Sequence, residues 1–411
     1  MSRPLLLVCL AVALTTTSQG ALELAYPLRQ HELGDPLNLV GVAFGLLSVG
    51  SLLSRLPAGA WYRSALAGRQ IAASLVVFAL TAGALGYTDI WLVQAALAVV
   101  HGFAFGLVTT FLLALLVDAQ PRTTNAAPSI AWFTAAITTG YGLGSLLGAQ
   151  TIEVFSVQAG FVFSAVTGLL AVLLAVYMPT PEAHDHGNAQ APIGGLRSIV
   201  GLPATVWLAC LVGFYLNFAQ DAYDSFFPIY AVGIGIAVGT IGVFRSLSAI
   251  ASAGIRFAAA GALRAWRPTT LTHAGILIIA AAGVSLSVTT SEWLLGGAFV
   301  LFGLMRALLR VTSATAVADE RQRSGGSVGM ASAVYNAGLD AGAILGPPAA
   351  GVLAGLFDIP TSFRVVALGL PVVYYVIWTF VNQRKELGAG SWELGSSSGP
   401  SSQLPTPRSH A

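Results

Sequence analysis

Long apolar runs separated by short polar breaks dominate the chain. A helix needs about 20 mostly apolar residues to cross the roughly 30 Å of hydrocarbon in a bilayer. Twelve runs of about that length can be marked, at residues 5–28, 39–61, 66–87, 90–117, 126–150, 161–178, 206–231, 237–257, 271–288, 293–317, 327–356 and 363–381. Because several breaks are only two to five residues long, the helices that they join should be antiparallel neighbours. The pattern predicts an all-α membrane protein with 12 transmembrane helices.

The composition indicates the same surroundings. Hydrophobic residues make up 55% of the chain and charged residues 9%, whereas a soluble globular protein has about 25% charged residues. So few charges could not cover the surface of a soluble fold, and the lipid bilayer is therefore the predicted solvent. The net charge of +2 gives no sign of a nucleic-acid partner.

The first run follows Met1-Ser2-Arg3 and could also be a signal peptide, but its removal would leave eleven spans.

Basic residues between the runs predict the orientation. Cytoplasmic loops collect Lys and Arg. With the N-terminus inside, the inner side holds twelve of these residues and the outer side only Arg29 and Arg364. We therefore expect a multi-pass protein of the cell membrane with both termini in the cytoplasm.

A polar segment divides the runs six and six. The predicted organisation is a six-helix bundle over residues 1–180, a cytoplasmic linker over 181–202, a second six-helix bundle over 203–383 and a cytoplasmic tail over 384–411. The tail is rich in Gly, Ser and Pro, which predicts disorder.

Landmarks recur about 200 residues apart. Arg55 near the end of the second run corresponds to Arg256 near the end of the eighth, an offset of 201. The glycine-spaced segments 144–148 and 342–346 correspond at an offset of 198. Because six is an even number, both copies enter the membrane in the same direction, as parallel repeats do in one class of secondary transporter. The repeat predicts two pseudo-symmetric bundles.

With this 6+6 arrangement, three segments resemble the major facilitator superfamily: 53–59, the glycine-spaced fifth run, and 345–351. The resemblance covers residues 1 to about 383 and implies a transporter whose halves rock about a central site. It also implies a cytoplasmic gate motif that falls on Arg55, Gly59, Arg63, Gly68, Arg69, Arg256 and Gly261. This chain has Arg63-Ser64 where the family has an Asp-Arg pair.

Polar residues inside the runs should outline a water-filled path, since a charge at the bilayer centre costs at least about 2.5–3.5 kcal/mol. The third, sixth and twelfth runs carry no ionisable residue away from their ends, and the ninth carries only His273. The resemblance implies that these four helices face lipid. The seventh run places Asn217, Gln220, Asp221 and Asp224 on one helical face, which predicts one wall of a cavity.

Depth along the helices selects the candidate site. The predicted substrate cavity consists of Arg306, Asn217, Gln220, Asn336, Gln19 and Tyr141. Arg306 is the leading contact because a guanidinium binds a carboxylate or phosphate through two hydrogen bonds, so the solute should be anionic or zwitterionic. A buried pair of Arg306 with Asp340 is the alternative.

Two further arginines receive roles from their depth. Arg245 lies level with Asp224, roughly 10–12 Å from the outer helix ends, and should form an outer ion pair with Asp224 or Asp221, or else contact the solute. Arg310, one turn beyond Arg306, is expected to extend to the membrane interface.

Four residues are candidates for proton coupling: Glu23, His101, Asp221 and Asp340. A carboxyl or imidazole group in a partly dry cavity can gain and lose a proton near neutral pH as the cavity opens to either side. For His101, a hydrogen-bonded structural role is the alternative. We expect a monomeric secondary transporter of a small organic solute, driven by a proton gradient and without a bound cofactor or metal.

Two other functions are alternatives to transport. A sensor could keep the transporter fold without moving solute. An intramembrane hydrolase would need a nucleophile and a base at matched depth, and Ser145 with His101 is the pair that qualifies. The segment Gly144-Ser145-Leu146-Leu147-Gly148 has one residue too many for a Gly-x-Ser-x-Gly elbow, so we do not expect an enzyme.

Overall fold

The computed structural model describes residues 3–119, 127–178, 202–324 and 328–396. This part of the chain consists of α-helices and one short 3₁₀ helix, η1 (Ser64–Leu66). The helices are α1 (Arg3–Glu32), α2 (Leu37–Trp61), α3 (Ala67–Leu85), α4 (Trp91–Asp118), α5 (Ala127–Val154), α6 (Val157–Val176), α8 (Ala204–Gly233), α9 (Val238–Ala265), α10 (Pro268–Val288), α11 (Glu292–Ser324), α12 (Val328–Leu356) and α13 (Ile359–Ser396). The predicted all-helical architecture is confirmed.

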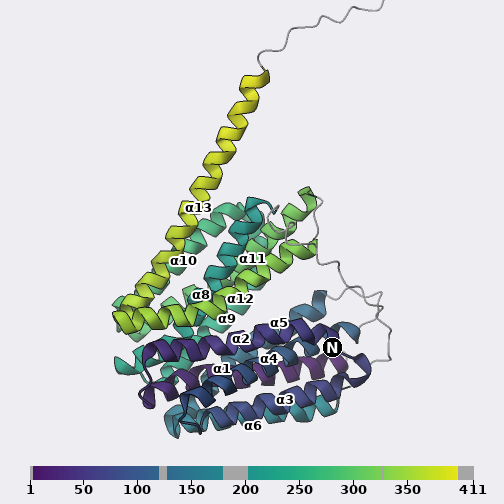
Figure 1. Ribbon diagram of the computed structural model, residues 1–411, viewed down its shortest axis with the longest axis vertical. Helices are drawn as coiled ribbons and strands as arrows, with labels where there is room; N and C mark the ends of the chain where they lie inside the picture. Colours follow the sequence, from purple (N-terminus) through teal and green to yellow (C-terminus); the bar gives the residue numbers. More distant parts are fainter. Residues whose placement is uncertain (1–2, 120–126, 179–201, 325–327, 397–411) are drawn as a thin grey trace, which may run out of the picture. The chain divides into compact units, whose positions relative to one another are not determined.

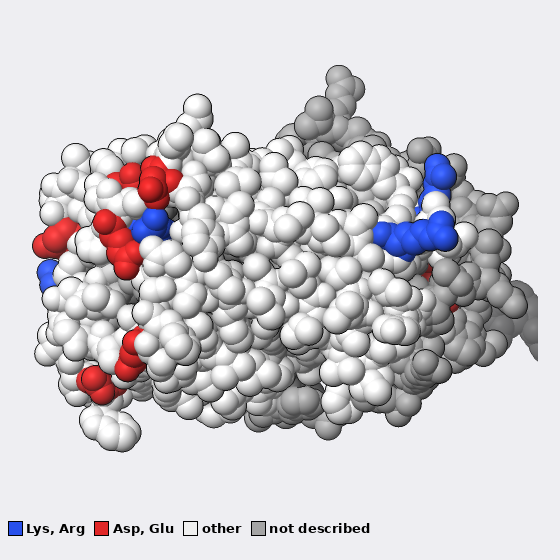
Figure 2. Space-filling model, turned by 90° about the horizontal axis from the view of Figure 1, so that it is seen from below, with Lys and Arg blue, Asp and Glu red and all other residues white. Residues whose placement is uncertain are grey.

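Eleven helices of the described chain are long and apolar enough to cross a membrane. The helix that is not among them is α8, whose middle carries Asn217, Gln220 and Asp221. These side chains lower its mean hydropathy because they belong to the polar stripe that the sequence places on this helix. The surface of the molecule also fits a membrane protein. On the face shown in Figure 2, a wide uncharged band separates mainly basic groups at one end from mainly acidic groups at the other.

The helices gather as two sets (Figure 1). In the first set α1 packs on α5 and α6, α3 on α4 and α6, and α2 on α4. In the second, α8 packs on α12, and α11 on α9 and α10. The sets meet mainly through two helix pairs, α2 with α12 and α5 with α9, and α8 also contacts α1 and α2. This arrangement fits the predicted division into six and six.

Small residues allow the two sets to approach closely. Gly45 of α2 lies against α12, where an added Cβ would be 2.9 Å from the Ile344 carbonyl oxygen and 3.0 Å from a Pro348 ring carbon. Gly242 of α9 lies against Ala149 and Ser145 of α5 in the same way. Small side chains are the usual means of close helix packing in lipid, where no hydrophobic force draws helices together.

One predicted segment has a different structure from the one expected, and others lie outside the described residues. Helix α13 continues to Ser396, so the start of the segment predicted as a disordered tail is helical, and from Val372 onward the chain forms a separate compact unit. Residues 397–411 and nearly all of the predicted linker lie outside the described residues.

Candidate functional site

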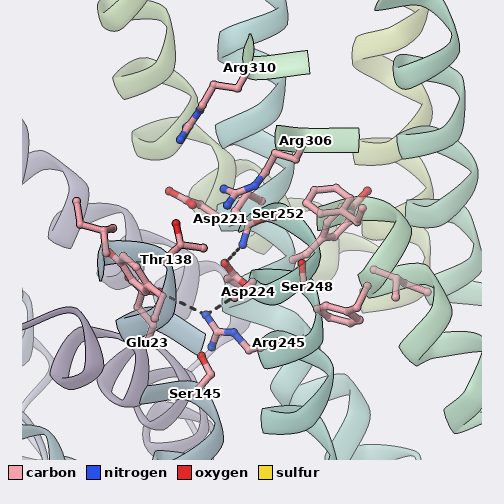
Figure 3. A pocket seen from close by; sticks show the side chains of 18 residues that line it. Glu23, Thr138, Ser145, Asp221, Asp224, Arg245, Ser248, Ser252, Arg306 and Arg310 are labelled. Carbon is pink, nitrogen blue, oxygen red and sulfur yellow. Dashed lines mark hydrogen bonds and ion pairs between the residues drawn. The ribbon is translucent and has the colours of Figure 1, made fainter. Parts of the chain in front are cut away.

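A cavity of about 260 Å³ lies between the two sets of helices. Helices α1 and α5 contribute to it from the first set, and α8, α9, α10 and α11 from the second. Its charged lining consists of Glu23, Asp221, Asp224, Arg245, Arg306 and Arg310. Figure 3 shows Arg306 and Arg310 toward one end, Arg245 at the other, and the two aspartates between them.

Arg245 joins the two sets of helices through carboxylates. Its Nη2 lies 3.3 Å from Asp224 Oδ1 on α8 and 3.4 Å from Glu23 Oε2 on α1. The Arg245 side chain is only 8% exposed. Gln19 donates to Glu23 at 3.1 Å, and Gln220 donates to Asp224. Depth predicts the contact of Arg245 with Asp224, whereas the contact with Glu23, a candidate for proton coupling, is not predicted from the sequence.

Asp221 and Arg306 face the same cavity without a direct bond. Among the described residues, neither the Asp221 carboxylate nor the Arg306 guanidinium makes a hydrogen bond or an ion pair within 4.0 Å. Arg306 is nevertheless close enough to attract Asp221 electrostatically. Two opposite charges thus line the cavity without a direct contact between them.

The structure excludes the alternative pair of Arg306 and the interfacial position predicted for Arg310. Arg306 does not pair with Asp340, because Asp340 accepts from Arg55 at 2.7 and 2.8 Å. This contact links α2 to α12. Arg310 does not extend to the interface: it lines the cavity and donates to Asn217 Oδ1 at 2.7 Å.

His101 lies inside the first set of helices and does not line the cavity. Its ring stacks on Phe78 with centroids 4.4 Å apart, and its Nε2 is 2.9 Å from Gln19 Oε1. Its Nδ1 is 3.1 Å from Thr81 Oγ1, and the residue is fully buried. The structure therefore does not bring His101 to Ser145, which lines the cavity, and the hydrolase pair is not assembled.

The remaining predicted cavity residues fall in three places. Tyr141 and Gln220 line the cavity. Gln19 is buried and bonds to both Glu23 and His101. Asn217 is not part of the lining but accepts a hydrogen bond from Arg310, which is. Asn336 is exposed and is not part of the lining.

The gate motif lies at the end of α2 and the start of α3. Arg63 and Arg69 are exposed, and Gly68 sits against the Ala175 carbonyl of α6. Gly59 lies in α2, and Arg256 and Gly261 lie in α9; their surroundings are outside the described part of the structure. Tyr62 and Ser64 both donate to Asp118 of α4, at 2.8 and 2.6 Å. Sequence reasoning missed Asp118, an acid that reaches this loop from another helix.

The described His, Cys, Asp and Glu residues form no group of three or more that could hold a metal ion. The charged and polar side chains that line the cavity offer ion pairing and hydrogen bonding. Apolar helices around a charged, half-enclosed cavity define a multi-pass membrane transport protein.

Comparisons with known proteins specify the family. The family model of the Major Facilitator Superfamily matches residues 8–329. The chain belongs to this superfamily. No curated protein sequence matches it.

Solved structures share the fold. One is a bacterial homolog of the human lysosomal transporter Spinster in an inward-facing and occupied conformation, with a TM-score of 0.72 at 14% identity over 93% of this chain and 98% of that chain. Another is the nucleoside transporter NupG, with a TM-score of 0.72 at 12% identity over 92% of this chain and 99% of that chain. At these identities the likeness establishes the fold alone.

Proposed function

We propose that the protein is a secondary active transporter that moves a small organic solute by alternating access and is driven by a proton gradient. The observation that carries the proposal is the cavity between the two sets of helices, with its six charged side chains. Charges in a membrane interior are costly and belong to a substrate or ion path. Both neighbouring structures are of proteins named as transporters.

The contacts between the two sets favour rocking of one set against the other. They combine glycine-mediated packing with a few polar links, such as Ser246 of α9 donating to the Gly142 carbonyl of α5. Contacts of this kind can separate and re-form as rigid halves move about a central site. The Glu23–Arg245 contact also crosses between the sets. Protonation of Glu23 would weaken it, which would couple a proton to the movement.

The test is uptake into proteoliposomes with a proton gradient imposed in either direction. Arg306→Ala should abolish uptake while the protein stays folded, because the leading cationic contact is removed. Arg364→Ala is the matched control, since Arg364 bonds to Ser287 and does not line the cavity. Uptake by Arg306→Ala at the level of Arg364→Ala and of the wild type would remove Arg306 from the solute path.

Wild-type protein that moves no solute under either gradient would favour the sensor over the transporter. The rest of the proposal is a monomer in the cell membrane with both termini in the cytoplasm. Labelling of Arg408→Cys in intact cells tests the orientation, since a cytoplasmic tail is not reached by an impermeant reagent.

A further inference from the structure

We infer that the cavity binds a small zwitterion of the α-amino acid type, with an ammonium, a carboxylate and an apolar body. The inference rests on the proposed transport function and names its solute class. Three features of the cavity support it: the balance of charge, the separation of one acid from one base, and the apolar remainder of the lining.

The charged lining is balanced. Three carboxylates (Glu23, Asp221 and Asp224) face three guanidinium groups, so their formal charges sum to zero. A solute that adds one negative charge would leave the enclosed site charged, which is expensive in a low-dielectric interior. A zwitterion adds no net charge and can still form ion pairs with both signs.

Within this balanced set, one acid and one base are left for a ligand. Arg245 already contacts both Glu23 and Asp224 through its Nη2. Asp221 and Arg306 have no bonded side-chain partner among the described residues and are more than 4.0 Å apart. An ammonium beside Asp221 and a carboxylate beside Arg306 would satisfy both groups. Arg310, one turn along α11 from Arg306, adds a second cation at the carboxylate end.

The remaining lining residues indicate what kind of side chain the solute carries. Phe299, Phe302 and Leu286 contribute apolar surface on α10 and α11, and the Phe302 ring stands edge-on to Tyr223 with centroids 5.4 Å apart. Aromatic walls favour an apolar or aromatic side chain. The volume of about 260 Å³ equals that of roughly eight or nine water molecules in the liquid, which suits a solute of amino-acid size and is too small for a lipid.

Four probes separate the charge requirements: L-phenylalanine, 3-phenylpropanoate without the ammonium, phenethylamine without the carboxylate, and uncharged uridine. Binding to the purified protein in detergent is measured by calorimetry and by thermal shift. L-Phenylalanine should bind at least tenfold more tightly than either singly charged analogue, because each lacks one ion pair. Uridine should not bind.

Two variants should reverse the preference in opposite directions. Asp221→Asn makes the lining net positive, so binding of L-phenylalanine should weaken about tenfold and that of 3-phenylpropanoate should strengthen. Arg306→Gln makes it net negative and should favour phenethylamine. Asp358→Asn, in the exposed loop before α13, should keep the wild-type order.

Equal or tighter binding of 3-phenylpropanoate, phenethylamine or uridine to the wild-type protein would overturn the zwitterion. So would the absence of binding by all four probes. Either result leaves the proposed transport function to be judged separately by flux. If a solute of a different class were taken up in an Arg306-dependent way, the proposed transport function would stand and the zwitterion would be rejected.

Discussion

Gly242→Ala should disfavour the conformation described here. Gly242 lies on α9 where that helix crosses α5, and an added Cβ would collide with the Ala149 side chain and lie 2.6 Å from the Ser145 carbonyl oxygen. Backbone cannot move aside as a flexible side chain can. Because α5 and α9 belong to different sets of helices, the collision exists only while the sets touch at this point.

The magnitude follows from the cost of overpacking, about 1–3 kcal/mol for an extra methyl group in a packed interface. In a two-state equilibrium, 1–3 kcal/mol changes the ratio of the states by about 5- to 150-fold. Replacing a helical glycine by alanine also favours the helix by about 0.8–1.0 kcal/mol. Gly254→Ala on the same helix has nothing within 4 Å of its added Cβ. The difference between the two variants therefore isolates the collision.

Spin labels at Val154 and Ala237 would report the separation of the two helices. Both positions are exposed, and they flank the place where the Gly239 backbone N–H donates to Glu153. In Gly242→Ala the distance distribution should shift toward longer values, whereas in Gly254→Ala it should match the parent. Identical distributions in the two variants would refute the argument that this contact sets the population.

Two further predictions concern the buried polar groups. Arg245→Gln leaves Glu23 and Asp224 without their cation and should destabilise the fold by about 3–5 kcal/mol, measured by denaturant unfolding in detergent. Adding Glu23→Gln and Asp224→Asn should restore most of the lost stability. Wild-type stability of the single variant would show that Arg245 does not stabilise the two carboxylates. His101→Ala should lower the thermal unfolding temperature, because the substitution removes the Phe78 stack and leaves Gln19 without its partner. It should not alter the pH profile of transport, and a changed pH profile with unchanged unfolding would return His101 to the coupling pathway.

Sequence pattern predicts most of the fold because the bilayer imposes it. An apolar run of fixed length has few structures open to it in lipid other than a helix, and the twelve marked runs correspond to the twelve described α-helices. Helix periodicity also identifies one wall of the cavity, since Gln220, Asp221 and Asp224 on α8 all line it. The stripe that makes α8 less apolar than the other helices is therefore the same feature that places it at the site.

Partners across the cavity are harder to predict. The sequence gives the depth of a residue along its helix, but it does not give the neighbouring helix toward which the side chain points. Glu23 and Arg245 are 222 residues apart and belong to different repeats. Arg306 and Asp340 are both near the middle of their helices, yet Asp340 turns to Arg55 on α2. Equal depth is a necessary condition for an ion pair, and the packing of neighbouring helices decides which pair forms.

Arg310 shows why even depth can mislead. The apolar run ends near residue 317, but α11 continues to Ser324, so Arg310 lies more turns from the true helix end than the run suggests. A long cationic side chain extends to the interface when water is within its reach; here the carbonyl oxygen of the Asn217 side chain is nearer, at 2.7 Å. Asn217 in turn donates to the Leu339 carbonyl of α12 at 3.0 Å. One amide thus holds the guanidinium at the cavity and ties α11 to α8 and α12, which places a second cation where the carboxylate of a solute would lie.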